Sequence, residues 1–226
     1  MFETLLHKPV VNILIGITGS VSGGSLGAAI IILTVVVRLF LAPLSIKTLR
    51  SQQKLQELSD KTKALRDKHA NDPAAQNAAI LQLYKDHNVN PLSGCLPLLI
   101  QFPLIIALYK GFLSVLSGTY ASLLYAFTPQ PEQLVTTFVG IVLTAPNHLL
   151  AIIAGVAQFA QLWVSARYQA PSATPNPLQS KQFLILFPAL VVVIGWNLPA
   201  GLSLYWAIST LLSIGEQHYA RVTAGR

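Results

Sequence analysis

The sequence predicts an all-α membrane protein with five transmembrane helices and a cytoplasmic helical hairpin between the first two. Hydrophobic residues make up 53% of the 226 residues and charged residues 10%, whereas about 25% of the residues of an ordinary soluble domain are charged. Stretches that approach the length needed to cross a hydrocarbon core recur five times. Lysine and arginine gather on one side of the resulting topology. A water-soluble core could not bury this much apolar surface.

The expected spans follow from hydropathy and turn residues. A helix needs about 20 apolar residues to cross the membrane, and Pro and Gly within residues 197–201 favour a turn over one long final helix. The expected order is an extracytoplasmic interfacial segment (1–25), span one (26–46), the cytoplasmic hairpin (47–90), span two (91–116), an extracytoplasmic loop (117–148), span three (149–166), a cytoplasmic loop (167–181), span four (182–197), span five (198–216) and a cytoplasmic tail (217–226).

Two further apolar stretches are too short to cross. Residues 9–17 are expected to form a helix lying on the outer membrane surface. A cleaved signal sequence is the alternative, although its basic end is only Lys8 and no A-x-A site follows. Residues 134–143 are expected to form a surface or re-entrant segment that leads into the third span.

Basic residues set the orientation, because cytoplasmic loops carry an excess of them. With five spans, most of these residues fall on one side: Lys47, Arg50, Lys54, Lys61, Lys63, Arg66, Lys68 and Lys85 after the first span, Arg167 and Lys181 after the third, and Arg221 and Arg226 after the fifth. The opposite side holds only Lys8 and Lys110. We therefore expect the amino terminus outside and the carboxyl terminus in the cytoplasm. The net charge of +7 then needs no nucleic acid to explain it.

The polar segment after the first span is expected to fold as two antiparallel helices. Leu55, Leu58 and Leu65 repeat at helical spacing among polar residues. Asp72 is placed to cap a second helix that has Pro73 at its first position. A solvated charged linker is the alternative.

Arg38 is the most informative residue of the predicted bundle. It lies roughly 18 Å along the first span from Leu26, where an arginine costs about 2.5 to 3.5 kcal/mol by insertion scales. Such a residue usually faces a hydrated cavity or a partner. The alternative is that the side chain snorkels toward the headgroups near Lys47.

We expect Arg38 to have no counter-ion. The apolar middles of the spans contain no acidic residue, and Glu216 falls at the end of the fifth span. The other candidate site residues are the polar or amphipathic side chains of the later spans: Gln101, Gln158, Gln161, Tyr205 and Trp206. Each glutamine could instead make only an interhelical hydrogen bond, and the two aromatic residues could serve packing alone. An uncompensated cation in a hydrated groove is the resulting hypothesis.

The sequence offers little support for catalysis or metal binding. The single cysteine, Cys95, cannot form an internal disulfide, and the histidines are scattered without metal-ligand spacing. An intramembrane hydrolase could use Ser203 with His148 or His218, but the serine lacks the usual following glycine. We expect no enzyme activity, no cofactor and no metal. A solute or anion transporter is the alternative function, although no paired inverted repeat is recognisable.

Four stretches resemble the YidC family of membrane protein insertases. They are IIILTVVVRLFLAPLSIKTLRSQQKLQEL at 30–58, YKDHNVNPLSGCLPLLIQFPLIIALYKGF at 84–112, LLAIIAGVAQFAQLW at 149–163 and FPALVVVIGWNLPAGLSLYWAISTLLSIGEQ at 187–217. They occur in the family's order and cover most of the chain. The large periplasmic domain of many Gram-negative members has no counterpart here, so the chain resembles a minimal form of the family.

This resemblance implies a five-helix core in a bacterial plasma membrane, with a lipid-exposed hydrophilic groove that faces the cytoplasm and has Arg38 at its centre. Gln101, Gln158 and Gln161 would keep the groove hydrated, Tyr205 and Trp206 would line the substrate path, and the hairpin would receive the incoming chain. The implied partners are nascent membrane proteins, the ribosome, the Sec translocon and the lipid bilayer. The short basic tail, with only Arg221 and Arg226, puts the ribosome contact in doubt.

Overall fold

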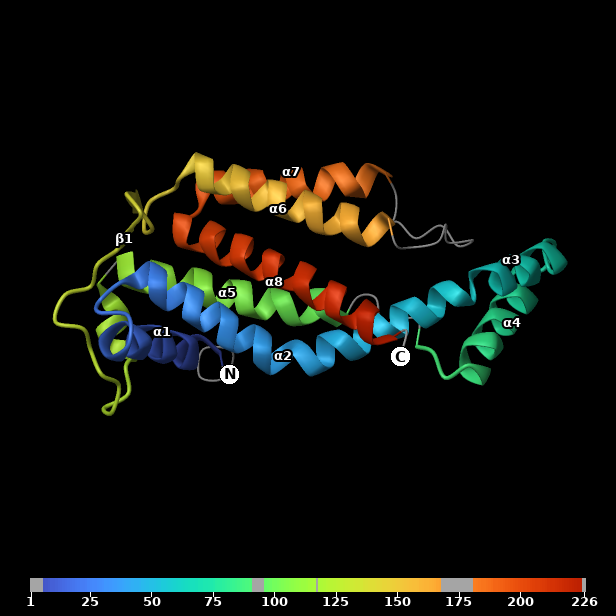
Figure 1. Cartoon of the computed structure of the whole chain (residues 1–226), viewed down its shortest axis with the longest axis horizontal. Helices are drawn as coiled ribbons and strands as arrows, with labels where there is room; N and C mark the ends of the chain where they lie inside the picture. The colour runs from blue at the N-terminus through green and yellow to red at the C-terminus, as the bar shows by residue number, and fades with distance from the viewer. Residues whose placement is uncertain (1–5, 91–95, 117, 168–180, 225–226) are drawn as a thin grey trace.

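Figure 1 shows the computed structural model, in which long helices run roughly parallel and two shorter helices project from one end. It describes residues 6–90, 96–116, 118–167 and 181–224. The elements in chain order are α1 (Lys8–Ser20), α2 (Leu26–Glu57), α3 (Ser59–Lys68), α4 (Pro73–Asp86), α5 (Leu96–Leu116), the 3-10 helix η3 (Thr119–Leu123), β1 (Thr137–Phe138), β2 (Ile141–Val142), α6 (His148–Arg167), α7 (Lys181–Asn197) and α8 (Ala200–Ala224).

One helix corresponds to each expected span: α2, α5, α6, α7 and α8. Among the described helices, Leu26–Glu57 and His148–Ala166 are long and apolar enough to cross a membrane, while Gln101–Val115 and Gln182–Asn197 are apolar but shorter. The turn predicted within residues 197–201 is confirmed, since α7 ends at Asn197 and α8 begins at Ala200. Residues 91–95 of the expected second span and 168–180 of the expected cytoplasmic loop lie outside the described residues.

α2 begins at a capping serine and continues beyond the expected end of the first span. The Ser25 hydroxyl accepts a hydrogen bond from the Ala28 amide at 3.3 Å. The helix then runs for 32 residues, about 48 Å at the rise of an α-helix. Apolar residues stop near residue 46, but the backbone stays helical because no glycine or proline follows Pro43 until Pro73. Arg38 and the residues that lead up to α3 therefore belong to one continuous helix.

α3 and α4 lie against each other at the end of the molecule far from β1 (Figure 1). The predicted cap of α4 is confirmed: the Asp72 carboxylate accepts hydrogen bonds from the amides of Ala74 and Ala75, both at 3.0 Å. The Gln76 side chain links the two helices by donating to the Arg66 carbonyl at 3.0 Å. Capping and this cross-link stabilise two helices that are each too short to be stable alone.

The long helices form layers, with α8 in the middle (Figure 1). α6 packs on both α7 and α8, whereas α2 packs on α8 and α1. A small apolar cluster joins α6, α7 and α8 through Ala154, Val191 and Ala207. Small residues let helix backbones approach closely, which is how helices associate without a hydrophobic driving force. α8 is therefore the helix through which the α6–α7 pair meets the rest of the bundle.

The main apolar core occupies only the amino-terminal halves of α2 and α8. It is built from α1, α2, α5 and α8 and includes the fully buried Leu14, Ile30, Phe112 and Leu202. Gly201 permits the close approach of α8 to α5, because a Cβ there would lie 2.8 Å from the Phe112 ring. Beyond this core, toward the carboxyl-terminal ends of α2 and α8, the two helices contact each other through polar side chains.

Within the apolar stretch 134–143, residues 137–142 form a β-hairpin near the amino-terminal end of α8. Thr137 pairs with Val142 in the antiparallel sheet, and Gly140 turns the chain with a φ of 76°. The carbonyls of Leu143 and Ala145 accept hydrogen bonds from the amides of Gly201 and Ala200, both at 2.9 Å. The loop thus satisfies amides that the first turn of α8 would otherwise leave without partners.

Asn12 joins α1 to the loop that follows α5. Its side-chain nitrogen donates to the carbonyls of Lys8 and Leu123, at 2.7 and 2.9 Å. Its side-chain oxygen accepts from the Tyr125 amide at 2.7 Å and the Thr128 hydroxyl at 2.6 Å. The residue is only 6% exposed, so water cannot replace these four bonds.

Asn12→Ala is therefore expected to lower the free energy of unfolding by about 2 kcal/mol, the cost of leaving buried polar groups unpaired. Asn77→Ala is the matched control, because Asn77 is exposed on α4 and alanine favours helix. Thermal unfolding of both variants in detergent micelles measures the difference. Equal midpoints for the two variants would contradict the anchoring role of Asn12.

Candidate functional site

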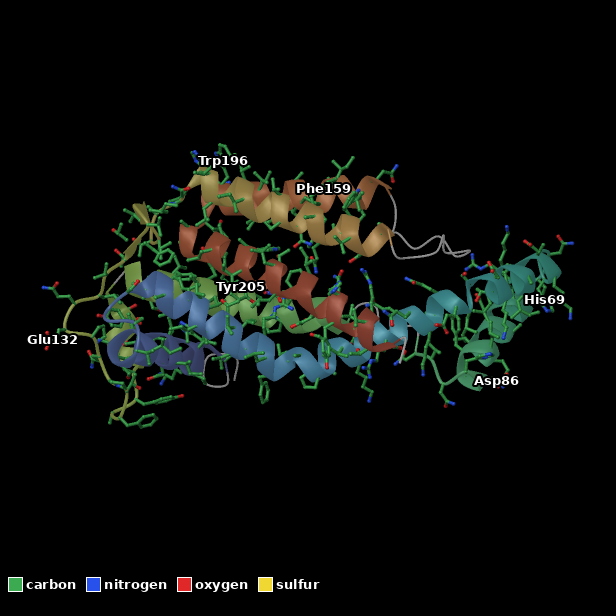
Figure 2. All side chains as sticks on the ribbon, viewed as in Figure 1. His69, Asp86, Glu132, Phe159, Trp196 and Tyr205 are labelled. Atoms are coloured by element: carbon green, nitrogen blue, oxygen red, sulfur yellow. The ribbon has the colours of Figure 1, made fainter. Side chains whose placement is uncertain are left out.

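α8 carries polar or amphipathic side chains on two adjacent faces. At 3.6 residues per turn, the first face holds Tyr205, Ser209 and Glu216, and the second holds Trp206, Thr210 and Gln217. Contacts described below turn the first face toward α2 and α5 and the second toward α6. Figure 2 places Tyr205 in the middle of the bundle. The site is built around this one helix.

Arg38 reaches from α2 to the first face. Its Nε and Nη2 atoms both donate to the Ser209 hydroxyl oxygen, at 2.9 and 2.6 Å. Its Nη1 atom lies 3.7 Å from Oε2 of Glu216 and makes no hydrogen bond within the described part of the chain. The Arg38 side chain is 19% exposed and the Glu216 side chain 14%. The two charges are thus mostly, but not completely, enclosed by protein.

The expectation that Arg38 has no counter-ion is wrong, because Glu216 is its ionic partner. Hydropathy places Glu216 at the end of the fifth span, but α8 continues to Ala224. The unbroken helix holds Glu216 two turns beyond Ser209, on the face toward α2. Ser45 of α2 also lies within hydrogen-bonding reach of the Glu216 carboxylate. The site therefore contains a loosely paired guanidinium that points toward α8, not an uncompensated one.

Gln101 and Tyr205 continue this polar network into α5. The Gln101 side-chain nitrogen donates to the Tyr205 hydroxyl at 2.5 Å, and the Ser209 side chain lies close to the same hydroxyl. Tyr205 is 3% exposed, so its hydroxyl depends on protein partners. Arg38, Ser209, Tyr205 and Gln101 thereby connect α2, α8 and α5.

The other three predicted residues meet on the second face of α8. The Trp206 indole nitrogen donates to Oε1 of Gln158 at 3.0 Å. The side-chain nitrogen of Gln158 donates in turn to Oε1 of Gln161 at 2.7 Å. About one turn beyond Gln161 on α6, the Ser165 hydroxyl donates to Oε1 of Gln217 at 3.0 Å. These bonds join α6 to α8 along much of their contact.

The six predicted residues therefore lie on α8 or next to it, but in two clusters. Gln101, Arg38 and Tyr205 belong to the first face, and the two α6 glutamines with Trp206 belong to the second. Sequence reasoning missed Ser209 and Glu216. Their signal is the recurrence of polar side chains four and eleven residues after Tyr205, which places all three on one helical face.

The residues of the hydrolase alternative do not meet. The Ser203 hydroxyl is buried and has no hydrogen-bond partner within the described part of the chain. The His148 ring stacks on Trp196 with a centroid distance of 3.9 Å, and His218 is exposed on α8. A serine nucleophile needs a base within hydrogen-bonding reach, and neither histidine supplies one here.

Comparison with known proteins identifies the family of the chain. The family described as "60Kd inner membrane protein" matches residues 17–224. A Fusobacterium nucleatum protein named "Membrane protein insertase YidC" is 30% identical over 196 residues, which cover 87% of this chain and 86% of that protein. A Helicobacter pylori protein of the same name is 35% identical over 198 residues, which cover 86% of this chain and 32% of that protein. The chain thus spans most of the first relative and about a third of the second.

A solved structure has the same fold. It is described as "Active YidC insertase crystal structure with the first transmembrane domain resolved" and is similar with a TM-score of 0.64 at 25% identity. The match covers 96% of this chain and 46% of that chain. The resemblance seen in the sequence motifs is therefore confirmed by family, relatives and fold together. The chain belongs to the 60Kd inner membrane protein family, the family of the bacterial membrane protein insertases named YidC.

Proposed function

We propose that this chain inserts newly synthesised membrane proteins into the bilayer and binds their polar segments at Arg38. The observation that carries this function is the state of the guanidinium: Ser209 fills the Nε–Nη2 edge, while Nη1 makes no hydrogen bond within the described residues. Carboxylates bind guanidinium groups through paired parallel hydrogen bonds. The Nη1–Nη2 edge is thus the place where an acidic side chain of a substrate can dock.

The proposed topology keeps the five expected spans. α2, α5, α6, α7 and α8 cross the membrane, the α3–α4 hairpin lies in the cytoplasm, and α1 with the loop before α6 lies at the outer end of the bundle. The excess of lysine and arginine on the hairpin side supports this orientation. The polar faces of α8 lower its hydropathy, which explains why length and composition do not mark it as a span.

The proposed mechanism needs no covalent step. An incoming apolar segment lies against the lipid-exposed side of the bundle while its polar tail lodges in a hydrophilic groove beside Arg38. Gln101, Gln158 and Gln161 keep this groove hydrated, and Tyr205 and Trp206 line the path. Polar groups of the protein replace part of the water that hydrates the tail. The free-energy cost of moving the tail through hydrocarbon is therefore lower. Burial of the substrate helix in lipid then drives release, at roughly 25 cal/mol per Å².

The partners follow from this mechanism. Nascent membrane proteins are the substrates, and the ribosome and the Sec translocon are the proposed sources of the chain. The α3–α4 hairpin is the proposed receiving surface, because α2 joins it directly to the helix that carries Arg38. The carboxyl-terminal end of α8 lies along α2 close to the point where α2 leads into the hairpin. There Arg50 donates a hydrogen bond to the Thr223 hydroxyl at 3.1 Å.

Site-specific photocrosslinking tests the proposed function. A photoreactive amino acid at position 161 or 206 is expected to crosslink to ribosome-bound nascent membrane proteins, because both positions line the proposed path. The same probe at Leu186, which is 68% exposed on α7, serves as the lipid-facing control. Crosslinks of equal yield at all three positions would contradict a defined path. Solute flux through protein-containing liposomes without substrate would favour the transporter alternative.

A further inference from the structure

Glu216 occupies the position beside Arg38 that a substrate carboxylate would need. Its Oε2 atom lies 3.7 Å from Nη1 of Arg38, longer than the 2.7 to 2.9 Å typical of a charge-assisted hydrogen bond. The pair is therefore held by attraction between charges and not by a formed hydrogen bond. Both side chains are partly exposed, at 19% and 14%, so an arriving group can reach them.

The register of α2 and α8 lets this ion pair open without disturbing either helix. Arg38 and Ser45 lie two turns apart on α2, and Ser209 and Glu216 lie two turns apart on α8. Arg38 is bound to Ser209, and Ser45 is within hydrogen-bonding reach of Glu216. Each charged group thus keeps its own neutral partner when the diagonal contact between the charges is broken.

From this geometry we infer that Glu216 is a specificity-determining residue, which competes with the acidic groups of incoming segments for Arg38. The inference rests on the proposed function, because it assumes that substrate tails bind the guanidinium. An acidic tail meets a site whose formal charges sum to zero, so it gains attraction from Arg38 and suffers repulsion from Glu216. A neutral tail meets neither effect. Glu216 thereby limits the preference of the site for acidic tails.

The test compares two single-span substrates that differ only in their tails, one acidic and one with the corresponding Asn and Gln residues. The full chain is reconstituted in liposomes, and insertion of both substrates is measured by protection from protease. Glu216→Gln is expected to raise the acidic-to-neutral insertion ratio by roughly tenfold, the effect of removing one like charge near 4 Å when the effective dielectric is closer to that of water than to that of the protein interior. Glu132→Gln, in an exposed loop position, is the matched control and is expected to leave the ratio unchanged.

A ratio that stays at the wild-type value in Glu216→Gln overturns the inference, as does an equal loss of both substrates together with a lower thermal midpoint. If the glutamine variant does not accumulate, Glu216→Asp keeps the charge but withdraws it from Arg38 by one methylene. That variant is expected to raise the ratio by roughly two- to threefold, since the interaction between charges weakens with distance. An unchanged ratio in a folded Glu216→Asp variant would then also overturn the inference.

Arg38→Ala separates this inference from the proposed function. If tails bind the guanidinium, the acidic-to-neutral ratio of Arg38→Ala falls well below the wild-type ratio. A ratio unaffected by Arg38→Ala defeats the proposed function itself. A ratio that responds to Arg38→Ala but not to Glu216→Gln defeats only the competitive role of Glu216.

Discussion

Arg38→Ala is expected to reduce the insertion of single-span proteins with acidic tails by about tenfold or more, the size of effect found when one partner of an enclosed charge pair is removed. The alanine removes the cation and leaves Glu216 without its ionic partner at 14% exposure. The site then repels an acidic tail instead of attracting it. Protease protection of substrates synthesised in the presence of liposomes measures the change.

Arg38→Lys is the control for charge and is expected to restore most of the insertion. An ammonium group supplies the positive charge, although it cannot reproduce the guanidinium fork that holds Ser209. A stably folded alanine variant that inserts acidic-tailed substrates at the wild-type rate would defeat the role assigned to Arg38. Neutral-tailed substrates are expected to lose much less.

Gly155→Leu is expected to destabilise the bundle by about 3 kcal/mol, because overpacking at a tight helix contact forces the backbones apart. A Cβ at Gly155 would overlap the side chain of Val192 on α7 and would lie 3.2 Å from the Pro188 carbonyl oxygen. The change separates α6 from α7, where the two helices pack most extensively.

Gly215→Leu is the matched control for this substitution. Gly215 also lies within a helix, and a Cβ there would meet no atom within 4 Å. Leucine has a higher helix propensity than glycine at both sites, so the two substitutions differ only in the packing around them. Thermal unfolding in micelles is expected to show a lower midpoint for Gly155→Leu alone. The same midpoint in both variants would show that the α6–α7 contact tolerates a larger side chain.

Local signals predicted much of the fold. The Asp72 cap and the turn after Asn197 depend on residues within a few positions, and the structure has both. The ends of α2 and α8 were harder to predict, because hydropathy reports where apolar residues stop and not where the backbone ceases to be helical. Both helices continue into polar sequence. The β-hairpin at 137–142 depends on pairing across Gly140, which hydropathy does not detect.

The sequence predicted which residues make up most of the candidate site, but not which of them contact each other. Polar residues within apolar spans mark Arg38 and the three glutamines, since such residues are costly unless they contact partners or water. The Arg38–Glu216 pair depends instead on the register between α2 and α8, residues far apart in the chain. The division into two clusters depends on how α8 is rotated between its neighbours. Neither property can be derived from spacing within one helix.

In the proposed topology, the ion pair also determines how a transmembrane voltage acts on the site itself. Moving one elementary charge across a membrane at 100 mV involves about 2.3 kcal/mol of electrical work. The opposite charges of Arg38 and Glu216 lie 3.7 Å apart, so the electrical forces on them nearly cancel. A carboxylate that docks between them gives the assembly a net negative charge, on which a potential negative inside exerts an outward force. In the proposed mechanism, the voltage therefore exerts a net force on the site with a bound carboxylate and almost none on the site without one.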